Sequence, residues 1–348
     1  MKGVAPDQLP EFDTHKLVTF VNDSKTGLKA YIVIHRGDSR RPSFGATRMW
    51  KYRSQSDALR EALRLSRIMS YKLAMAGLPY GGAKGVIAAS RGALKNRRAL
   101  LKSYATMVNY FGGRFITGTD VGLNQNDLYL MRRASPYMVG VKGDATRFTA
   151  FGILQGIRVS LKEVFGNDSI AKRAFAIQGV GKVGGALLNL LYPHAGRILI
   201  ADINRQQLRA VMRRFPKVEV VKPSEIHRQE VDVFSPCAMS HSITRRKARE
   251  LVCKIVAGGA NSQLEDNGAG DIMHNRGILY APDYAVNAGG LISVVDEYEH
   301  KRFDPKRVMR RVFDIRKNLR VIFALARRTR RPTHVVADEI AEQKFNGN

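Results

Sequence analysis

From about residue 150 onward, short apolar runs alternate with stretches of helical periodicity. Such alternation is typical of a doubly wound α/β domain, in which helices cover both faces of a parallel sheet. No other feature constrains the fold of this chain as strongly, and it predicts such a domain over residues 135–326. The runs that read as strands are AFAIQ, RILIAD, VEVV, VDVFS, KIVAGG and GILYAP.

The first of these strands leads into a glycine-rich turn. Glycines recur there with GxGxxG spacing, and a helical stretch follows. One glycine permits a tight turn, another lets the backbone approach a pyrophosphate, and the third lets the helix pack closely on the strand. The pattern predicts a Rossmann-type dinucleotide site at the start of the helix. The alternative is a glycine-rich turn without a ligand. The residues of the expected site are Gly179, Val180, Gly181, Lys182, Val183 and Gly184.

The next strand ends at Asp202, eighteen residues after Gly184. A carboxylate at this place can accept hydrogen bonds from the hydroxyl groups of a ribose. It would also repel an additional phosphate, so the sequence favours NAD over NADP. Arg205 lies close enough in the sequence to keep NADP as the alternative.

The first part of the chain mixes strands and helices. We expect strands in LKAYIVIHR, FGATRMW and RFIT, and helices over residues 57–76 and about 96–111. A chain of 348 residues exceeds the size at which single cores usually stop growing, so we expect two domains. The first covers residues 1–134, with residues 327–348 returning to it, and the second covers residues 135–326.

Two lysines of the first domain stand in unusual surroundings. Lys72 continues the inward-facing stripe of the helix over residues 57–76, and Lys84 lies in the apolar, glycine-rich run LPYGGAKGVI. We interpret the small residues around Lys84 as leaving room for a ligand near the backbone. One lysine could then hold a carboxylate while the other, with a lowered pKa, acts as a base. The alternatives are a snorkelling helix-end lysine and an incidental charge in a turn.

A carboxylate follows the last strand of the first domain. Asp120 lies at a glycine-bounded turn in FITGTDVG, where it could accept an ammonium group and move protons. An aspartate in a turn is by itself more often structural. The catalytic hypothesis therefore depends on Asp120 together with Lys72 and Lys84.

The chain is strongly basic, with 58 Lys and Arg against 30 Asp and Glu and a net charge of +28. The excess is densest over residues 301–331, where apolar residues recur at helical spacing. We interpret this stretch as a packed helix with a solvated cationic face, and a surface that binds nucleic acid is the alternative. The recurring apolar residues are Val308, Val312, Ile315, Leu319 and Ile322.

Cysteine usage and hydropathy exclude several other classes. The two cysteines, Cys237 and Cys253, are too few for a disulfide framework, and no Cys/His cluster has metal-ligand spacing. No apolar run reaches the length of a membrane span, and the N-terminus lacks a secretory pattern. The sequence therefore predicts a cytoplasmic protein without a metal site or a membrane segment.

Several stretches together resemble a known family. GATRMWKY, LRLSRIMSYKLAMAGLPYGGAKGVI, FITGTDVG, TAFGI, GVGKVG, SPCA and YAPDYAVNAGGLI occur in the order found in the glutamate/leucine/phenylalanine/valine dehydrogenases. The resemblance spans about residues 15–343 and is strongest to the leucine, valine and phenylalanine branch. It implies an N-terminal α/β substrate domain, a Rossmann-type NAD domain, an active-site cleft between the two, and assembly into a homo-oligomer.

The resemblance also implies a reaction and the residues that carry it. The reaction is the reversible, NAD-dependent oxidative deamination of an L-amino acid to a 2-oxo acid and ammonia. By motif match, Lys72 binds the substrate carboxylate, Lys84 activates the attacking water, and Asp120 carries protons to and from nitrogen. The residues expected to position the cofactor, and in the case of Asn287 also the substrate, are Thr149, Cys237, Ala238, Asn261 and Asn287.

Two positions favour an apolar substrate side chain. Glutamate-specific members of the family carry a lysine and a serine that serve the side-chain carboxylate, and this chain has Phe44 and Val294 there. An apolar pocket does not offset the desolvation of a second carboxylate, so we expect a branched-chain substrate, with an aromatic amino acid as the alternative. Gly45 is expected to contact the substrate through its backbone, although Ala46 replaces a second family glycine. An alternative of another class is a catalytically weak relative that binds nucleic acid.

Overall fold

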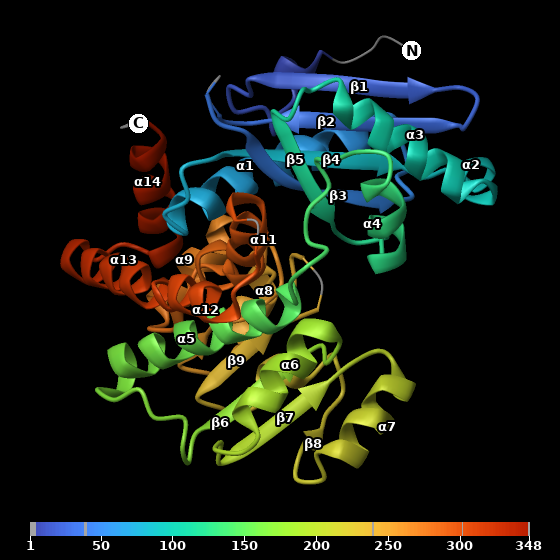
Figure 1. The fold of residues 1–348 in the computed structure, drawn as a ribbon. Helices are drawn as coiled ribbons and strands as arrows, with labels where there is room; N and C mark the ends of the chain where they lie inside the picture. Colours follow the sequence, from blue (N-terminus) through green and yellow to red (C-terminus); the bar gives the residue numbers. More distant parts are fainter. Residues whose placement is uncertain (1–4, 38–39, 239, 301, 347–348) are drawn as a thin grey trace. The chain divides into compact units, whose positions relative to one another are not determined.

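The computed structural model describes residues 5–37, 40–238, 240–300 and 302–346, and Figure 1 shows its fold. The chain forms two compact units that interleave in sequence. The first consists of Met1–Gly143, Val294–Phe303 and Lys344–Asn348. The second consists of Asp144–Ser293 and Asp304–Gln343, so each unit is built from separate segments of the chain.

The first unit contains a mixed sheet with the strand order β1-β2-β4-β3-β5. The pairs β1–β2 and β2–β4 are antiparallel, whereas β3 pairs in parallel with both β4 and β5. Strand β3 therefore lies between two strands that follow it in the sequence. The strands are β1 (Leu17–Asp23), β2 (Leu28–Ile34), β3 (Ser43–Trp50), β4 (Gly81–Ala88) and β5 (Phe115–Thr119).

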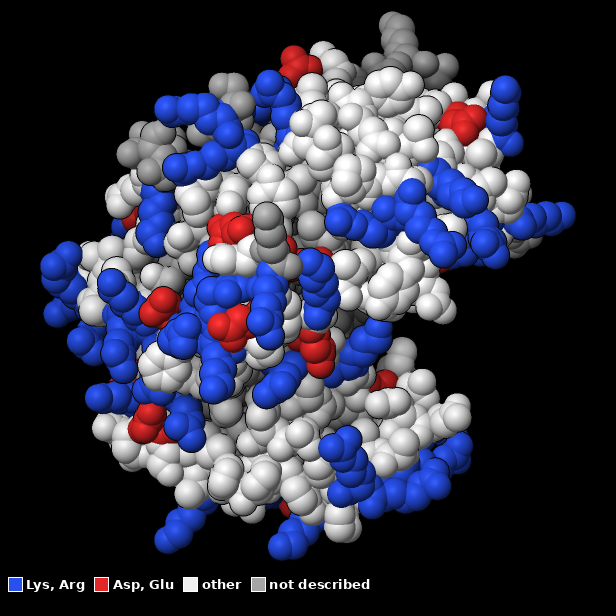
Figure 2. Space-filling view, in the orientation of Figure 1, with Lys and Arg blue, Asp and Glu red and all other residues white. Residues whose placement is uncertain are grey.

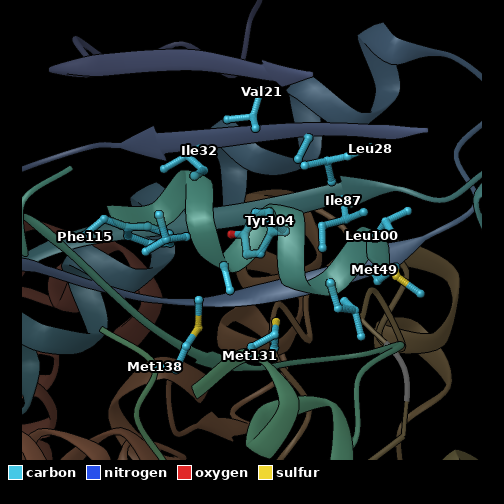
Figure 3. Close-up of a cluster of buried hydrophobic side chains, with 14 of the residues drawn as sticks. Val21, Leu28, Ile32, Met49, Ile87, Leu100, Tyr104, Phe115, Met131 and Met138 are labelled. Carbon is cyan, nitrogen blue, oxygen red and sulfur yellow. The ribbon is translucent and has the colours of Figure 1, made fainter. Parts of the chain in front are cut away.

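Helices of the first unit cover both faces of this sheet. On one face the buried side chains of β2 and β4 pack against α1, whose first turn is capped by Ser54 through the N–H of Asp57. On the other face they pack around Tyr104 of α3, and Figure 3 shows this core. The helices are η1 (Pro6–Gln8), α1 (Gln55–Met75), α2 (Arg91–Lys95), α3 (Arg97–Asn109) and α4 (Gln125–Arg132).

The second unit contains a six-stranded sheet with the order β11-β10-β9-β6-β7-β8. Every pair is parallel, which confirms the predicted doubly wound sheet and its candidate strands. The strand order changes direction at β6, and ligands of such sheets bind beyond the carboxyl ends of the strands at this point. The strands are β6 (Ala174–Gln178), β7 (Arg197–Ala201), β8 (Glu219–Val220), β9 (Val233–Pro236), β10 (Ile255–Val256) and β11 (Leu279–Tyr280).

Most of the remaining helices belong to the second unit. Helix α11 begins in this unit and ends in the first, because the division falls between Ser293 and Val294. The helices are α5 (Ala145–Phe165), α6 (Lys182–Leu191), α7 (Arg205–Arg214), η2 (Ile226–Arg228), α8 (Arg245–Glu250), α9 (Asn267–Asn275), α10 (Asp283–Val286), α11 (Gly289–Glu299), α12 (Pro305–Phe313), α13 (Ile315–Thr329) and α14 (Thr333–Asn346).

The basic stretch forms two helices, α12 and α13, where we expected one. The break falls at Asp314, which keeps right-handed helical dihedral angles, so the apolar stripe continues across it. All five residues of the predicted stripe are buried, as expected. The outer side carries the cations, and Figure 2 shows Lys and Arg gathered over these helices.

The last helix differs from its expected placement. We expected residues 327–348 to return to the first unit, but only residues 344–348 group with it. Helix α14 belongs to the second unit up to Gln343, and the hydroxyl group of Tyr284 donates to Asp338 of this helix at 2.6 Å. In the described part of the chain, no helix is long and apolar enough to cross a membrane.

Candidate active site

Lys84 and Asp120 form a buried ion pair. The Nζ of Lys84 lies 2.6 Å from Oδ2 of Asp120, and the two side chains are only 5% and 16% exposed. Asp120 follows β5 directly, and its N–H donates to the carbonyl of Thr47 on β3 at 2.9 Å. Because β3 pairs with both β4 and β5, the sheet order brings the two predicted residues together.

A third charged residue, which the sequence argument did not single out, joins this pair. The Nε of Arg48 lies 3.0 Å from the same Oδ2 of Asp120, and Nη1 of Arg48 bonds Glu61. Glu61 in turn accepts a hydrogen bond of 2.8 Å from Nη2 of Arg64. The signal that could have identified Arg48 is its place in GATRMWKY, one of the quoted motifs.

Burial and these neighbours set the protonation of the pair. Burial lowers the pKa of Lys84; Asp120 opposes this effect and Arg48 adds to it. Burial by itself raises the pKa of Asp120, but the cations of Lys84 and Arg48 outweigh it and hold that pKa well below its usual range. The site therefore combines a permanent carboxylate with an amine that gives up its proton more readily than an exposed lysine.

The glycines around Lys84 have a different role from the one we expected. A Cβ at Gly81 would collide with the carbonyl of Arg36, and one at Gly82 with the backbone of Ser70 on α1. A Cβ at Gly85 would collide with the hydroxyl group of Tyr104 on α3. Protein atoms, rather than a ligand, therefore occupy the space beside these glycines, and the tight packing fixes β4 between its covering helices.

Lys72 lies in the last turn of α1 and is only 8% exposed. It comes two residues after Ser70, whose Oγ accepts a hydrogen bond from the N–H of Gly82 at 3.1 Å. Side chains alternate along a strand, so Gly82 and Lys84 face the same side of the sheet. Lys72 therefore belongs to the helix that covers the Lys84 side of β4.

The residues expected to contact the substrate side chain lie in the first unit. Phe44 is fully buried, and its ring makes edge contacts with Tyr80 and Tyr298 at centroid distances of 4.7 and 5.2 Å. Val294 is half-buried on α11, with Cγ2 beside Gly140. Phe44 thus belongs to an aromatic cluster with Tyr80 and Tyr298, and Val294 is an apolar side chain on α11.

The backbone around these residues is held tightly. A Cβ at Gly45 would collide with the carbonyl of Ala83, so glycine is required for the close pairing of β3 with β4. The buried carboxylate of Glu297 accepts the N–H groups of three successive residues, at distances of 3.2, 3.2 and 2.9 Å. These bonds fix the segment 140–142 against the part of α11 that carries Val294.

The glycine-rich turn has the geometry that a dinucleotide requires. Gly179 has a φ of +90°, which favours glycine, and a Cβ at Gly184 would collide with the carbonyl of Gly179. Gly181 is the N-cap residue of α6 and offers no side-chain cap, and a Cβ there would meet nothing within 4 Å. Space and free amide groups are thus present where a pyrophosphate would bind. Lys182 is exposed in the first turn of α6, and Val183 packs near Gly259.

Asp202 lies at the end of β7, beside this turn. Its Oδ2 accepts the N–H of Val180 at 2.8 Å, and its Oδ1 accepts the N–H of Asn204 at 2.8 Å. Each carboxylate oxygen keeps a further acceptor site, so Asp202 can still bind two ribose hydroxyl groups.

The other expected cofactor residues cluster at the neighbouring strand ends. Cys237 follows β9, and its Sγ accepts the N–H of Gly259 at 3.4 Å. Burial raises the pKa of Cys237 to about 12, so its thiol is neutral at ordinary pH. Ala238 is exposed and would contact a Cβ at Gly179.

Asn261 and Asn287 are joined by a hydrogen bond of 3.0 Å between Oδ1 of Asn261 and Nδ2 of Asn287. The Oδ1 of Asn287 is buried and has no hydrogen-bond partner among the described residues. Thr149 is half-buried on α5, one turn after Ala145, whose carbonyl accepts a hydrogen bond of 2.8 Å from Oγ1 of Thr149. A buried acceptor without a partner is costly, so Asn287 provides a fitting contact for an N–H donor of a ligand.

Comparison with known proteins gives the class of this chain. The family described as Glu/Leu/Phe/Val dehydrogenase, dimerisation domain, matches residues 15–137, and the Glutamate/Leucine/Phenylalanine/Valine dehydrogenase family matches residues 198–319. The matches identify an amino acid dehydrogenase, an oxidoreductase that acts on a CH–NH2 group with a nicotinamide cofactor. The chain belongs to the glutamate/leucine/phenylalanine/valine dehydrogenase family, as the motifs predicted.

Individual relatives match over nearly the whole chain. Leucine dehydrogenase of Geobacillus stearothermophilus is 37% identical over 95% of this chain and 90% of its own length. Valine dehydrogenase of Streptomyces coelicolor is 36% identical over 95% of this chain and 92% of its own. The crystal structure of L-tryptophan dehydrogenase from Nostoc punctiforme is 34% identical, covers 96% of both chains and has a TM-score of 0.80.

Proposed function

We propose that this protein catalyses the reversible NAD-dependent oxidative deamination of an apolar, branched-chain L-amino acid. The substrate, NAD⁺ and water give the 2-oxo acid, an ammonium ion, NADH and a proton. The observation that carries the proposal is the buried contact of 2.6 Å between Lys84 and Asp120 on the first unit of a chain of this family. Bound NAD supplies the acceptor for the hydride that leaves the α-carbon of the substrate.

The residues of this chain have separate roles in the proposed reaction. Lys72 binds the substrate carboxylate through its buried ammonium group. Lys84, as the neutral amine, takes a proton from the water that attacks the imine carbon of the substrate. Asp120 accepts the substrate ammonium group and transfers protons to and from nitrogen. The low pKa of Asp120 agrees with a carboxylate that pairs with the substrate ammonium group, and the lowered pKa of Lys84 agrees with its role as the base.

The proposed substrate class depends on Phe44 and Val294, which offer no partner for a second carboxylate. The names of the leucine and valine dehydrogenase relatives agree with a branched-chain substrate. The rings of Phe44, Tyr80 and Tyr298 favour one alternative, an aromatic amino acid, and the related tryptophan dehydrogenase agrees with it. A branched-chain substrate and an aromatic substrate would need side-chain pockets of different sizes.

The choice of NAD depends on Asp202, which offers acceptors to a ribose diol beside the open turn at Gly181. We also propose a homo-oligomer, since the match over residues 15–137 is to a dimerisation domain. A cytoplasmic location agrees with the two free cysteines, Cys237 and Cys253.

The decisive experiment measures NADH formation by the purified protein with leucine, valine, isoleucine, phenylalanine, tryptophan and glutamate. We expect the highest kcat/KM with a branched-chain amino acid and no turnover of glutamate. Lys84→Ala should lower kcat by about 10²- to 10⁴-fold, because a positioned base contributes that much. The matched control Lys102→Ala, at an exposed position on α3, should keep the wild-type rate. Normal turnover by Lys84→Ala would refute the role of Lys84.

One observation favours a second activity, the binding of nucleic acid. Several exposed cations of α12, α13 and the residue that follows carry no ion pair among the described residues. Unpaired cations on one surface attract phosphates, and such binding weakens steeply with salt. The test is fluorescence anisotropy of a labelled RNA over a salt series; no salt-sensitive binding at low ionic strength would exclude the activity. These cations are Lys306, Arg310, Lys317, Arg320, Arg328 and Arg330.

A further inference from the structure

Two cations share one oxygen atom of Asp120. Lys84 Nζ lies 2.6 Å and Arg48 Nε 3.0 Å from Oδ2. The other end of Arg48 is bound by Glu61, and Arg64 is bound to Glu61 in its turn. The result is a chain of charged groups that runs from α1 through β3 to the carboxylate beside Lys84.

The charges of this chain balance without Lys84. Arg48 and Arg64 carry two positive charges, and Asp120 and Glu61 carry two negative charges. The ammonium group of Lys84, with a side chain only 5% exposed, adds a fifth and uncompensated charge. The group is thus electroneutral when Lys84 is a neutral amine, the state that a base requires.

The other ionisable groups on this face of the sheet do not favour the ammonium form of Lys84. Burial raises the pKa of Tyr52, so its hydroxyl group stays neutral. Burial lowers the pKa of His35 to about 3, so its ring is also neutral at ordinary pH. Lys72 is a further basic side chain on the covering helix α1. Among the neighbours that set the pKa of Lys84 in the described part of the chain, the carboxylates of Asp120 and Glu61 favour its protonated form.

We propose that Arg48 and Glu61 are positioning residues that set the basicity of Lys84 through their opposite effects on Asp120. Arg48 competes with Lys84 for Oδ2, which makes the ammonium form less stable. Glu61 holds the guanidinium group of Arg48 and limits this competition. The inference rests on the proposed function, in which Lys84 acts as the base, and it assigns both residues a role in that reaction.

The proposal predicts that two charge-removing variants shift the pKa of Lys84 in opposite directions. Arg48→Gln leaves Asp120 to Lys84 alone, so the pKa of Lys84 should rise, by about one unit for the loss of one close cation. Glu61→Gln frees Arg48 to bind Asp120 and adds a net positive charge, so the pKa of Lys84 should fall. The present geometry supports both signs, because Arg48 lowers and Glu61 raises the pKa of Lys84.

The experiment measures kcat/KM against pH for the wild type and both variants, since this ratio reports the groups of the free enzyme. We expect the rising limb to move to higher pH in Arg48→Gln and to lower pH in Glu61→Gln. Arg48→Lys, which restores the charge, should return the limb toward the wild-type position. The control Arg60→Gln, on α1 but paired with Glu11 at 3.1 Å, should leave it unchanged.

A direct measurement separates this inference from the proposed function. The titration of Lys84 can be followed by ¹³C NMR of protein labelled at the lysine ε-carbon, with the signal identified by its loss in Lys84→Met. Opposite shifts of this signal in Arg48→Gln and Glu61→Gln would support the inference. No shift, or shifts of the same sign, would overturn it even if the wild type were active. Absence of wild-type turnover with every amino acid tested would instead refute the proposed function. Glu61→Gln changes no side-chain volume, so it keeps the test available if Arg48→Gln does not fold.

Discussion

His35 lies in the middle of a buried chain of hydrogen bonds that connects the N-terminal segment to β4. The Nε2 of His35 bonds Oδ2 of Asp13 at 3.0 Å, and its Nδ1 bonds Oγ of Ser70 at 2.9 Å. That Oγ also accepts the N–H of Gly82, two residues before Lys84. A neutral ring that donates from Nε2 and accepts at Nδ1 satisfies every one of these contacts.

The protonation of His35 predicts how the stability of the protein depends on pH. Burial lowers the pKa of His35 to about 3 in the folded protein, whereas an unfolded histidine titrates near 6.5. Between these values the unfolded chain binds a proton that the folded chain does not, so stability falls as the pH falls below 6.5. Over this range each pH unit changes the free energy of unfolding by about 1.4 kcal/mol. We therefore expect the low pKa of His35 to reduce this free energy by about 2 kcal/mol at pH 5.

Urea unfolding at pH 7.5 and at pH 5 measures this effect. His35→Gln, whose side chain does not titrate, should be less stable than the wild type at pH 7.5 because the hydrogen bonds change. Its further loss of stability on going to pH 5 should be smaller than that of the wild type by about 2 kcal/mol. The control His194→Gln, at an exposed position after α6, should show the wild-type dependence on pH. Equal losses in the wild type and His35→Gln would refute the reasoning.

Three other predictions follow from the packing, the charge and the cofactor turn. Gly82→Ala should lower the free energy of unfolding by about 1–3 kcal/mol or more, because its Cβ meets the backbone of Ser70. Gly92→Ala, where a Cβ meets nothing within 4 Å, should not be destabilising, and urea unfolding of both variants checks the pair. The melting temperature should rise as NaCl increases from about 0.05 to about 0.5 M, since salt screens the self-repulsion of a net charge of +28, and a falling melting temperature would contradict this. Asp202→Ser should reduce the ratio of kcat/KM for NAD to that for NADP by at least about tenfold, and steady-state kinetics with an unchanged ratio would contradict the assigned role.

The parallel sheet of the second unit could be predicted from the sequence because most residues of its inner strands β6, β7, β9 and β10 are buried. Such strands appear as short, nearly continuous apolar runs separated by amphipathic helices. The break at Asp314 could not be predicted in the same way. The apolar stripe of α12 continues into α13 without a change of register, so the periodicity gives no sign that the helix is interrupted.

The glycines around Lys84 show where sequence reasoning reached the wrong physical explanation. A glycine-rich run has the same pattern whether its missing Cβ atoms leave space for a ligand or for other parts of the protein. Gly82 and Gly85 face opposite sides of β4, toward Ser70 and Tyr104. Only the structure shows that a helix occupies each side.

The sequence argument singled out Lys84 but not Arg48, and the order of the strands explains this difference. Side-chain alternation alone predicts that Arg48 on β3 and Lys84 on β4 each share a face with the even-numbered residues of their own strand. It does not predict that the two strands are neighbours, or that their parallel register pairs Arg48 with Val86, two residues from Lys84. Strand β3 precedes β4 in the sequence yet separates it from β5, and this order brings Arg48 to the same carboxylate oxygen as Lys84. The sheet therefore builds the charged group from long-range pairing, which is why motif spacing singled out Lys84 and Asp120 but not Arg48.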